Sequence, residues 1–120
     1  MSCYNKAKEL YDRIGQGQMN EAFEDLYADN CKIIEADGSV REGKDAQREA
    51  IKMWQTQMVK EFHGGGVHSI TANEDTNTTC VECWTEITNA DGHRFKMEEV
   101  AVQNWEDGKI VKERFYYNMP

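Results

Sequence analysis

Residues 94–117, RFKMEEVAVQNWEDGKIVKERFYY, are typical of two antiparallel strands joined by a tight turn. The segments 94–105 and 109–117 are rich in β-branched and aromatic residues, which favour extended backbone. Between them, Glu106-Asp107-Gly108 predicts a three-residue loop that pairs Trp105 with Lys109, with the glycine in the left-handed conformation. This register places the odd-numbered residues of both strands on one face of the sheet and the even-numbered residues on the other.

The odd face of this hairpin carries most of the bulky apolar side chains, so we expect it to lie against the helices. It comprises Phe95, Met97, Glu99, Ala101, Gln103, Trp105, Val111, Glu113, Phe115 and Tyr117. The even face comprises Lys96, Glu98, Val100, Val102, Asn104, Ile110, Lys112, Arg114 and Tyr116. A register slip of one residue would instead send the polar members of the odd face to solvent.

Helical periodicity fills the first half of the chain. Apolar residues recur at steps of three and four from Cys3 to Ile14, and this stripe stops at Gly15. Asn20 is expected to cap a short second helix. A third helix is predicted from about Asp45 to Phe62, ended by the glycine run 64–66 through positive φ angles. The inner stripe expected for it is Ala46, Ala50, Met53, Trp54, Gln57 and Met58.

The order of these elements defines the expected fold class. Strand-like segments at 31–36, 67–73 and 80–88 accompany the closing hairpin, and turn-forming residues separate the later ones. Helices first and a meander second predict an α+β fold, a cone-shaped curved antiparallel sheet wrapped around three N-terminal helices. Residues 1–120 suffice for one core, so we expect a single domain.

Composition excludes several classes of function. The net charge of −8 argues against nucleic-acid binding and against anionic membrane surfaces. No apolar run exceeds three residues and the start shows no apolar signal core, so a cytoplasmic location is expected. Cys80 and Cys83 form a C-x-x-C motif, but in a strand their sulfur atoms point to opposite faces. We therefore predict neither a redox site nor a metal site, and no cofactor.

Three stretches carry a family resemblance: FEDLYADNCKIIEADG at 23–38, REGKDAQREAI at 41–51, and VAVQNWEDGKIVKERFYYN at 100–118. In this order they resemble the nuclear transport factor 2-like (cystatin-like) superfamily, which includes SnoaL-like polyketide cyclases and ketosteroid isomerase. The resemblance implies a pocket between the helices and the concave sheet face, and often a homodimer through the outer face. It does not imply one activity, because the superfamily holds isomerases, cyclases, hydrolases, binding proteins and transport adaptors.

The polar residues of the odd face are the first candidates for a site. Glu99, Gln103 and Glu113 lie on an otherwise apolar surface, where unpaired charges cost several kcal/mol. We expect them to line the mouth of a cavity, where two nearby carboxylates would raise at least one pKa and suit acid–base chemistry. The expected ligand wall comprises Trp54, Met97, Ala101, Gln103, Phe115 and Tyr117.

Two further candidates follow from the resemblance to ketosteroid isomerase. Tyr11, sixteen residues before Tyr27, resembles the tyrosine that donates a hydrogen bond to the substrate oxyanion. Glu35, eight residues after Tyr27, matches the aspartate base, although Asp37 would take this place if the strand slips. Glu35 could equally be a solvated residue at a strand end. Ala101 occupies the position of the second oxyanion donor, so the complete isomerase arrangement is not expected.

These candidates define two functional hypotheses. The first is an acid–base enzyme (isomerase, cyclase or hydratase) on a small apolar or aromatic carbonyl metabolite, using Tyr11 and one or more of Glu35, Glu99 and Glu113. The second is a ligand-binding protein or dimeric adaptor without catalysis. A homodimer is expected because the even face mixes an apolar centre with charged residues. That patch comprises Val100, Val102, Ile110 and Tyr116 with Lys96, Glu98, Lys112 and Arg114.

Overall fold

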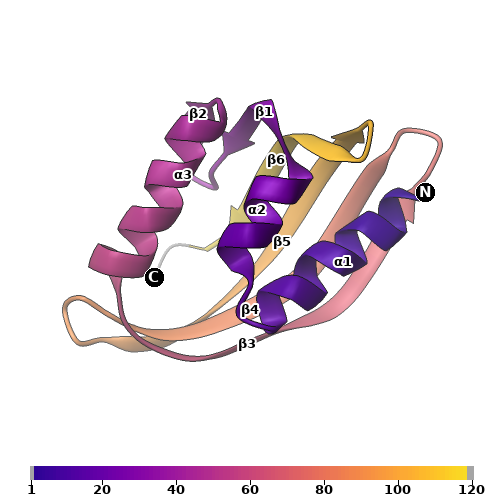
Figure 1. The fold of residues 1–120 in the computed structure, drawn as a ribbon. Coiled ribbons are helices and arrows are strands. Elements are labelled where there is room, and N and C mark those ends of the chain that lie inside the picture. Colours follow the sequence, from indigo (N-terminus) through magenta and orange to yellow (C-terminus); the bar gives the residue numbers. More distant parts are fainter. Residues whose placement is uncertain (1, 119–120) are drawn as a thin grey trace.

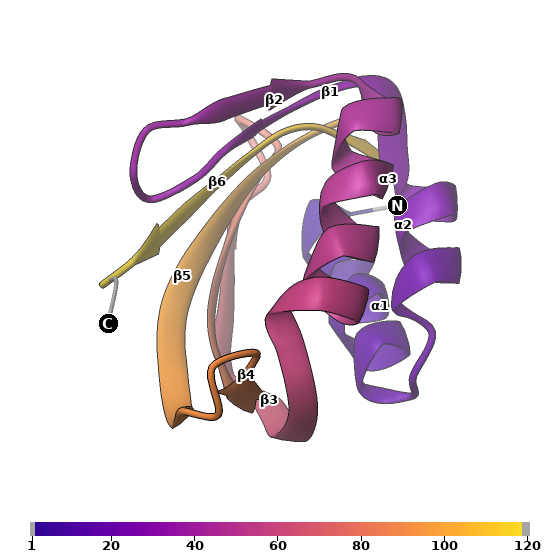
Figure 2. The same ribbon diagram turned by 90° about the vertical axis from the view of Figure 1, so that its left-hand side faces the viewer.

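The structure, a computed structural model, describes residues 2–118. Its elements are α1 (Cys3–Gly15), α2 (Met19–Leu26), β1 (Tyr27–Ile34), β2 (Val40–Glu42), α3 (Lys44–Met53), the π-helical turn η1 (Trp54–Met58), β3 (Val59–Asn73), β4 (Thr78–Asn89), β5 (Arg94–Glu106) and β6 (Lys109–Tyr117). The strands form one six-stranded sheet in the order β2-β1-β6-β5-β4-β3. The helices lie on one side of it (Figure 1), and the sheet curves around them (Figure 2). The predicted α+β fold is confirmed, and the sheet is mixed because β1 runs parallel to β6.

The hydrophobic core lies between α1, α2 and the part of the sheet next to the β5–β6 turn. From α1 it takes Cys3, Ala7 and Leu10, and from α2 Ala22, Phe23 and Leu26. These side chains pack with Ile33, Trp105 and Ile110 of the sheet, all buried. The two helices follow the sequence pattern, except that α2 begins before Asn20, with Gln18 in the capping position and no side-chain cap.

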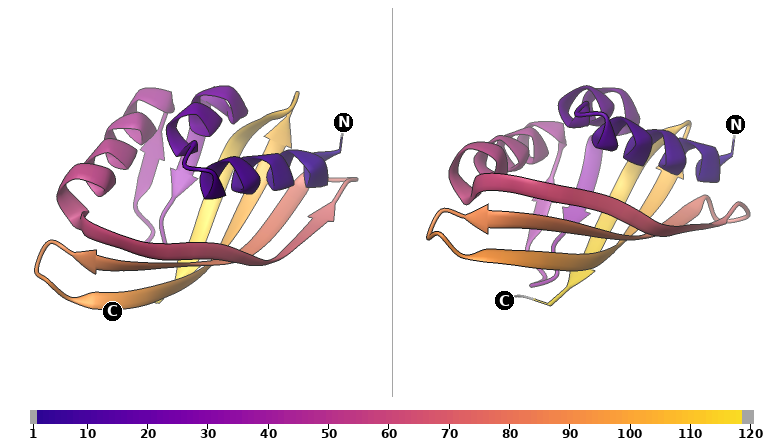
Figure 3. Two further views of the ribbon diagram at one scale, coloured as in Figure 1. Left: turned by 60° about the horizontal axis from the view of Figure 1, so that its bottom comes forward. Right: turned by 90° about the horizontal axis from the view of Figure 1, so that it is seen from below.

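The third helix ends earlier than the sequence predicted. α3 stops at Met53, η1 follows, and Phe62 already belongs to β3. The glycine run does not end a helix, because all three glycines lie in β3 and none has a positive φ. A Cβ atom on Gly66 would lie 2.8 Å from Nε1 of Trp84, and one on Gly64 would lie 3.4 Å from its Cη2. These glycines therefore serve close packing of the strand against an indole ring. Figure 3 shows the resulting long ribbon of β3 beside β4 and β5.

The β5–β6 turn is shorter than expected, and a bulge compensates for it. Asp107 and Gly108, with φ of 53° and 77°, form a two-residue loop that pairs Glu106 with Lys109. The register then shifts after Asn104, so odd residues pair with odd residues from Gln103–Glu113 onward. Two assignments are corrected in consequence. Ile110, expected on the outer face, is fully buried opposite Trp105, and Val111, expected inside, is the extra residue of the bulge.

The expected inner stripe of the third helix is largely exposed. Met53 and Met58 are 51% and 53% exposed, and the residue of α3 that is buried is Gln47. α3 makes its strand contacts mainly with β1 and β2, at one edge of the sheet. Figure 2 shows it standing apart from the middle strands. Phe62 of β3 is 60% exposed and Met97 of β5 is half-buried, so part of the concave face remains accessible.

Candidate functional site

A group of polar side chains is sealed inside the fold where α1, β1, β4, β5 and β6 meet. Glu113 is 1% exposed and Gln103, directly opposite on β5, is 0% exposed. We call this group the buried polar cluster; it comprises Tyr11, Tyr27, Thr79, Gln103, Trp105 and Glu113. The inward orientation predicted for Gln103 and Glu113 is confirmed, and the alternative of a slipped register is wrong.

Every member of the buried polar cluster is hydrogen-bonded to another. Gln103 Nε2 donates to Glu113 Oε2 at 2.8 Å and to Tyr11 Oη at 3.2 Å. The Tyr27 hydroxyl donates to the other oxygen of Glu113. Thr79 Oγ1 donates to Gln103 Oε1 at 2.7 Å, and Trp105 Nε1 donates to Thr79 Oγ1 at 2.8 Å. The cost of burying these groups is therefore offset by a complete network.

Burial changes the acid strength of these groups. It raises the pKa of Glu113 to about 7, although hydrogen bonds from Tyr27 and Gln103 oppose the rise and the charges of Glu99 and Glu35 add to it. Burial, followed by the negative charge of Glu113, holds the pKa of Tyr11 and that of Tyr27 well above the ordinary value. Both tyrosines are thus hydrogen-bond donors near neutral pH.

Glu99 lies on the same face as Glu113 but is only half-buried. It faces Tyr117 across the β5–β6 pair and accepts a hydrogen bond from Cys83 Sγ at 3.6 Å. Burial raises the pKa of Glu99, the Cys83 bond opposes this, and the charge of Glu35 adds to it. Burial and the charge of Glu99 raise the pKa of Cys83 to about 12, so its thiol stays protonated. Within residues 2–118, Glu99 forms no ion pair with Lys or Arg.

Glu35, which follows β1, is held by two donors from the strands on either side of β1, Arg41 on β2 and Tyr117 on β6. Its Oε1 accepts from Arg41 Nη2 at 2.8 Å, and its Oε2 accepts from the Tyr117 hydroxyl at 2.6 Å. Arg41 is itself fixed by donating to Gln47 Oε1 at 2.8 Å. The bond to Tyr117 places Glu35 on the inner face, so it is not a solvated strand-end residue. Asp37 accepts from the Ser39 backbone in the turn and does not take its place.

Tyr11 and Glu35, both candidates from the resemblance to ketosteroid isomerase, belong to separate hydrogen-bonded pairs. Tyr11 bonds to Gln103, and Glu35 bonds to Tyr117. Among the expected ligand-wall residues, Ala101 and Gln103 are fully buried and lie beneath the accessible surface. Met97, Phe115, Tyr117 and Trp54 are half-buried. The carboxylates Glu35, Glu99 and Glu113 are brought together, since the charges of Glu35 and Glu99 both raise the pKa of Glu113 and that of Glu35 also raises the pKa of Glu99.

Along the inward side chains of β5, burial falls from the β5–β6 turn toward the β4–β5 turn, although Ile87 of β4 is buried there. Ala101 and Trp105 are buried, whereas Phe95 and Met97 are half-buried. Phe62, in the same row as Ile87 and Phe95, is 60% exposed. We call this accessible region the open inner face; it comprises Phe62, Phe95, Met97, Glu99, Phe115 and Tyr117. On this face Glu99 lies two residues from Met97 along β5 and opposite Tyr117 on β6.

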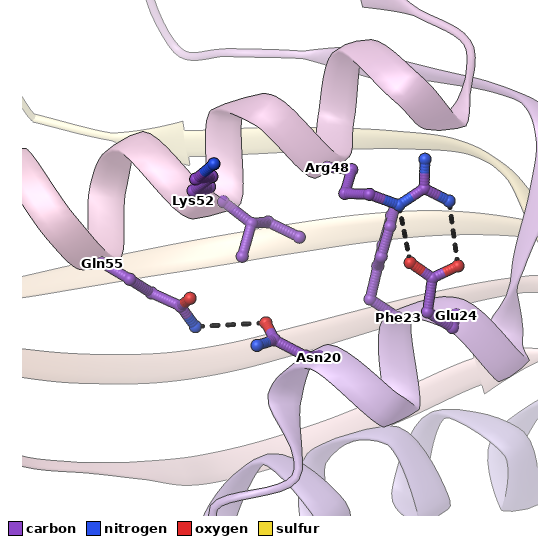
Figure 4. A pocket seen from close by; sticks show the side chains of 7 residues that line it. Asn20, Phe23, Glu24, Arg48, Lys52 and Gln55 are labelled. Atoms are coloured by element: carbon purple, nitrogen blue, oxygen red, sulfur yellow. Dashed lines mark hydrogen bonds and ion pairs between the residues drawn. The ribbon is translucent and has the colours of Figure 1, made fainter.

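The surface also carries two hollows, one apart from the open inner face and one that shares Glu99 and Tyr117 with it. One, of about 270 Å³, lies between α2 and α3 (Figure 4); its lining includes Phe23 and Ile51, and Glu24–Arg48 and Asn20–Gln55 bonds span it. The other, of about 490 Å³, crosses mainly the outer face near the end of β6. Its lining residues are Ala36, His68, Glu82, Glu98, Glu99, Val100, Tyr116, Tyr117 and Asn118. His68 and Glu98 approach within 3.6 Å there.

Sequence reasoning missed Arg41, Tyr27 and Thr79 as members of the site. Thr79 could have been found, because it shares the inward parity of Gln103 once β4 and β5 are aligned. Arg41 carried no such signal, since its partner depends on how the β1–β2 turn folds. Among the described residues, no group of His, Cys, Asp and Glu is arranged to hold a metal ion, and none of the helices is long and apolar enough to cross a membrane.

The chain matches a known protein family and several solved structures. A family model described as a SnoaL-like domain matches residues 1–117. A solved protein from Mesorhizobium loti, provisionally assigned as a SnoaL-like polyketide cyclase, has 32% identity and a TM-score of 0.87 over 98% of this chain and 100% of its own. A search of curated proteins found no match.

Two further solved structures share the fold at lower identity. A nuclear transport factor 2-like protein from Burkholderia pseudomallei has 17% identity and a TM-score of 0.80, over 98% of this chain and 92% of its own. A provisionally assigned isomerase from Bacillus subtilis has 22% identity and a TM-score of 0.74, over 98% and 90%. At these identities the likeness concerns the fold alone.

Proposed function

Because the chain belongs to the SnoaL-like domain family and has the nuclear transport factor 2-like fold, we propose that it is an acid–base enzyme acting on a small apolar carbonyl compound. The ligand would lie over the open inner face. The observation that carries the proposal is Glu99, a half-buried carboxylate with a raised pKa among aromatic side chains and without a cationic partner. A carboxylate whose pKa moves toward neutrality is suited to take and return a proton.

The roles of the other groups follow from their contacts. Tyr11 is the proposed donor to the oxygen atom on which negative charge develops, because its hydroxyl stays protonated and lies near enough to Cys83 and Glu99 for their charges to raise its pKa. Both oxygens of Glu35 already accept strong hydrogen bonds, so Glu99 is the freer base. Glu113 is sealed from ligands and acts through its charge and hydrogen bonds.

Proton abstraction next to a carbonyl can be followed without knowing the natural substrate. A panel of small cyclic and aromatic ketones in deuterium oxide, monitored by proton NMR, would reveal enzyme-catalysed exchange at the α-carbon. We expect Glu99→Gln to lower the exchange rate by roughly 10²–10⁴-fold. Glu98→Gln is the matched control, since Glu98 is the neighbouring residue on the outer face and is exposed.

Three outcomes would change the proposal. If Glu99→Gln exchanges deuterium at the native rate and Glu35→Gln does not, then Glu35 is the base. Equal rates in all variants would show that the reaction does not use these carboxylates. Ligands that raise the melting temperature while none is exchanged would favour the second candidate, a ligand-binding protein without catalysis. Ala101 stands where the isomerase has its second donor, and because a methyl group cannot donate a hydrogen bond this residue favours the second candidate.

We also propose that the protein forms a homodimer through the outer sheet face. Val100 and Val102 are half-buried there, and Tyr116 is 49% exposed. Exposed charged residues of both signs, Lys96, Glu98, Lys112 and Arg114, surround them, so opposite charges can pair across a two-fold axis.

A further inference from the structure

The direction of the hydrogen bonds in the buried polar cluster is set at one end by Trp105. An indole N–H donates and cannot accept. It donates to Thr79 Oγ1 at 2.8 Å, so this oxygen acts as an acceptor on that side. The single proton of the Thr79 hydroxyl is then available for Gln103 Oε1, which lies 2.7 Å away.

This arrangement fixes which way the Gln103 amide points. With Oε1 facing the Thr79 hydroxyl, the two Nε2 protons point to Tyr11 Oη and to Glu113 Oε2. In the reversed amide, the oxygen would face the carboxylate of Glu113 and repel it. The orientation of an amide is normally assigned from its network; here the ionised carboxylate of Glu113 accepts only, and the proton that Thr79 keeps after accepting from Trp105 completes the same orientation.

The same direction of the hydrogen bonds determines whether Glu113 and Tyr11 donate to Gln103 or accept from it. Glu113 accepts from Gln103 through one oxygen and from Tyr27 through the other. Tyr11 accepts the second Gln103 proton, so its own hydroxyl proton is not used by Gln103. Tyr11 also interacts with Cys83, whose thiol donates to Glu99 of the open inner face at 3.6 Å.

We propose that Trp105, Thr79 and Gln103 form a one-way hydrogen-bond relay that holds Glu113 as an acceptor and directs the Tyr11 hydroxyl proton toward the open inner face. The three are positioning residues, since each is buried and acts through Glu113 or Tyr11. The ligand-directed part rests on the proposed function, whereas the relay itself is a property of the unliganded protein.

Removing the Thr79 hydroxyl should allow the Gln103 amide to reverse. Without it, a protonated Glu113 can donate to Gln103 Oε1 after the amide reverses, and the reversed amide also draws the Tyr11 proton away from the open inner face. Thr79 therefore opposes protonation of Glu113. Other titratable groups act on Glu113 or are acted on by it: Tyr11, Tyr27, Cys31, Glu35, Cys83 and Glu99. The test must leave all of them in place.

Thr79→Val removes the hydroxyl at nearly constant volume, and Thr79→Ser keeps it. Carbon-13 NMR of the glutamate carboxyl groups, in the unliganded protein across a pH series, reports the pKa of Glu113. We expect Thr79→Val to raise this pKa by roughly 0.5–1, the equivalent of one net hydrogen bond. We expect Thr79→Ser, which keeps the hydroxyl, to retain the native pKa of Glu113. The Gln103 side-chain amide signals should shift with the Glu113 titration in Thr79→Val far more than in the native protein.

An unchanged Glu113 pKa in Thr79→Val, or an equal rise in Thr79→Ser, would overturn the relay. Trp105→Phe gives a second test if Thr79→Val does not fold. It frees Thr79 to turn its proton away from Gln103, and the pKa of Glu113 should rise in the same direction. No change in that variant would also count against the relay. Because these measurements need no ligand, an absence of turnover would contradict the proposed function and leave the relay standing.

Discussion

Replacing Glu113 with glutamine should remove a large pH dependence from the stability of this protein. Burial raises the pKa of Glu113 from 4.5 to about 7, so the folded state binds this proton more tightly than the unfolded chain. The corresponding stabilisation is complete below the unfolded pKa of 4.5 and is lost as the pH rises through about 7. A difference of this size corresponds to about 3 kcal/mol in the free energy of unfolding.

Urea unfolding between about pH 4 and pH 8 would measure this effect. The native protein should lose about 3 kcal/mol over this range relative to Glu113→Gln, whose side chain does not ionise. Glutamine also gives up one of the two accepted hydrogen bonds, a cost of roughly 1 kcal/mol that is independent of pH. The variant is therefore expected to be less stable than the native protein in acid and more stable above neutrality.

Glu98→Gln is again the control, because it removes an exposed carboxylate of the outer face and leaves the buried polar cluster intact. Parallel profiles for native protein and Glu113→Gln would refute the reasoning. They would mean that Glu113 is ionised equally easily in the folded and unfolded states, in conflict with its burial.

The remaining predictions concern packing and assembly. Gly66→Ala should destabilise the fold by roughly 1–3 kcal/mol, because the new Cβ meets Nε1 of Trp84 at 2.8 Å; thermal unfolding equal to that of Gly15→Ala, which has open space around it, would contradict this. Val102→Asp should convert the proposed homodimer to a monomer in sedimentation at micromolar concentration. Native protein that sediments as a strict monomer would exclude the dimer.

Local sequence signals were sufficient for the elements whose packing partners are set by periodicity. α1 follows from the apolar stripe that ends at Gly15, and its first turn is capped by Ser2, which accepts from the Asn5 backbone at 3.1 Å. The alternation along residues 94–105 placed Gln103 inside and Lys96 outside. Asp107-Gly108 correctly predicted a turn, but the sequence did not show that its loop has two residues instead of three.

Signals that depend on distant residues were misread. The glycines at 64–66 have the composition of a helix end, yet their conformation is decided by Trp84 on the next strand. The exposed side of α3 could not be distinguished from a buried one, because apolar periodicity is the same whether a face meets protein or remains accessible.

The sequence by itself determined the α+β class, the order of the elements and the inward direction of Glu99, Gln103 and Glu113. These features depend on period, turn chemistry and alternation, which act over a few residues. Only the tertiary structure decided that Glu113 is sealed while Glu99 is accessible, and that Glu35 is tied to Tyr117. Such differences depend on the parallel β1–β6 pairing and on where the helices stop covering the sheet. Those contacts join residues about 80 positions apart, and no local pattern specifies them.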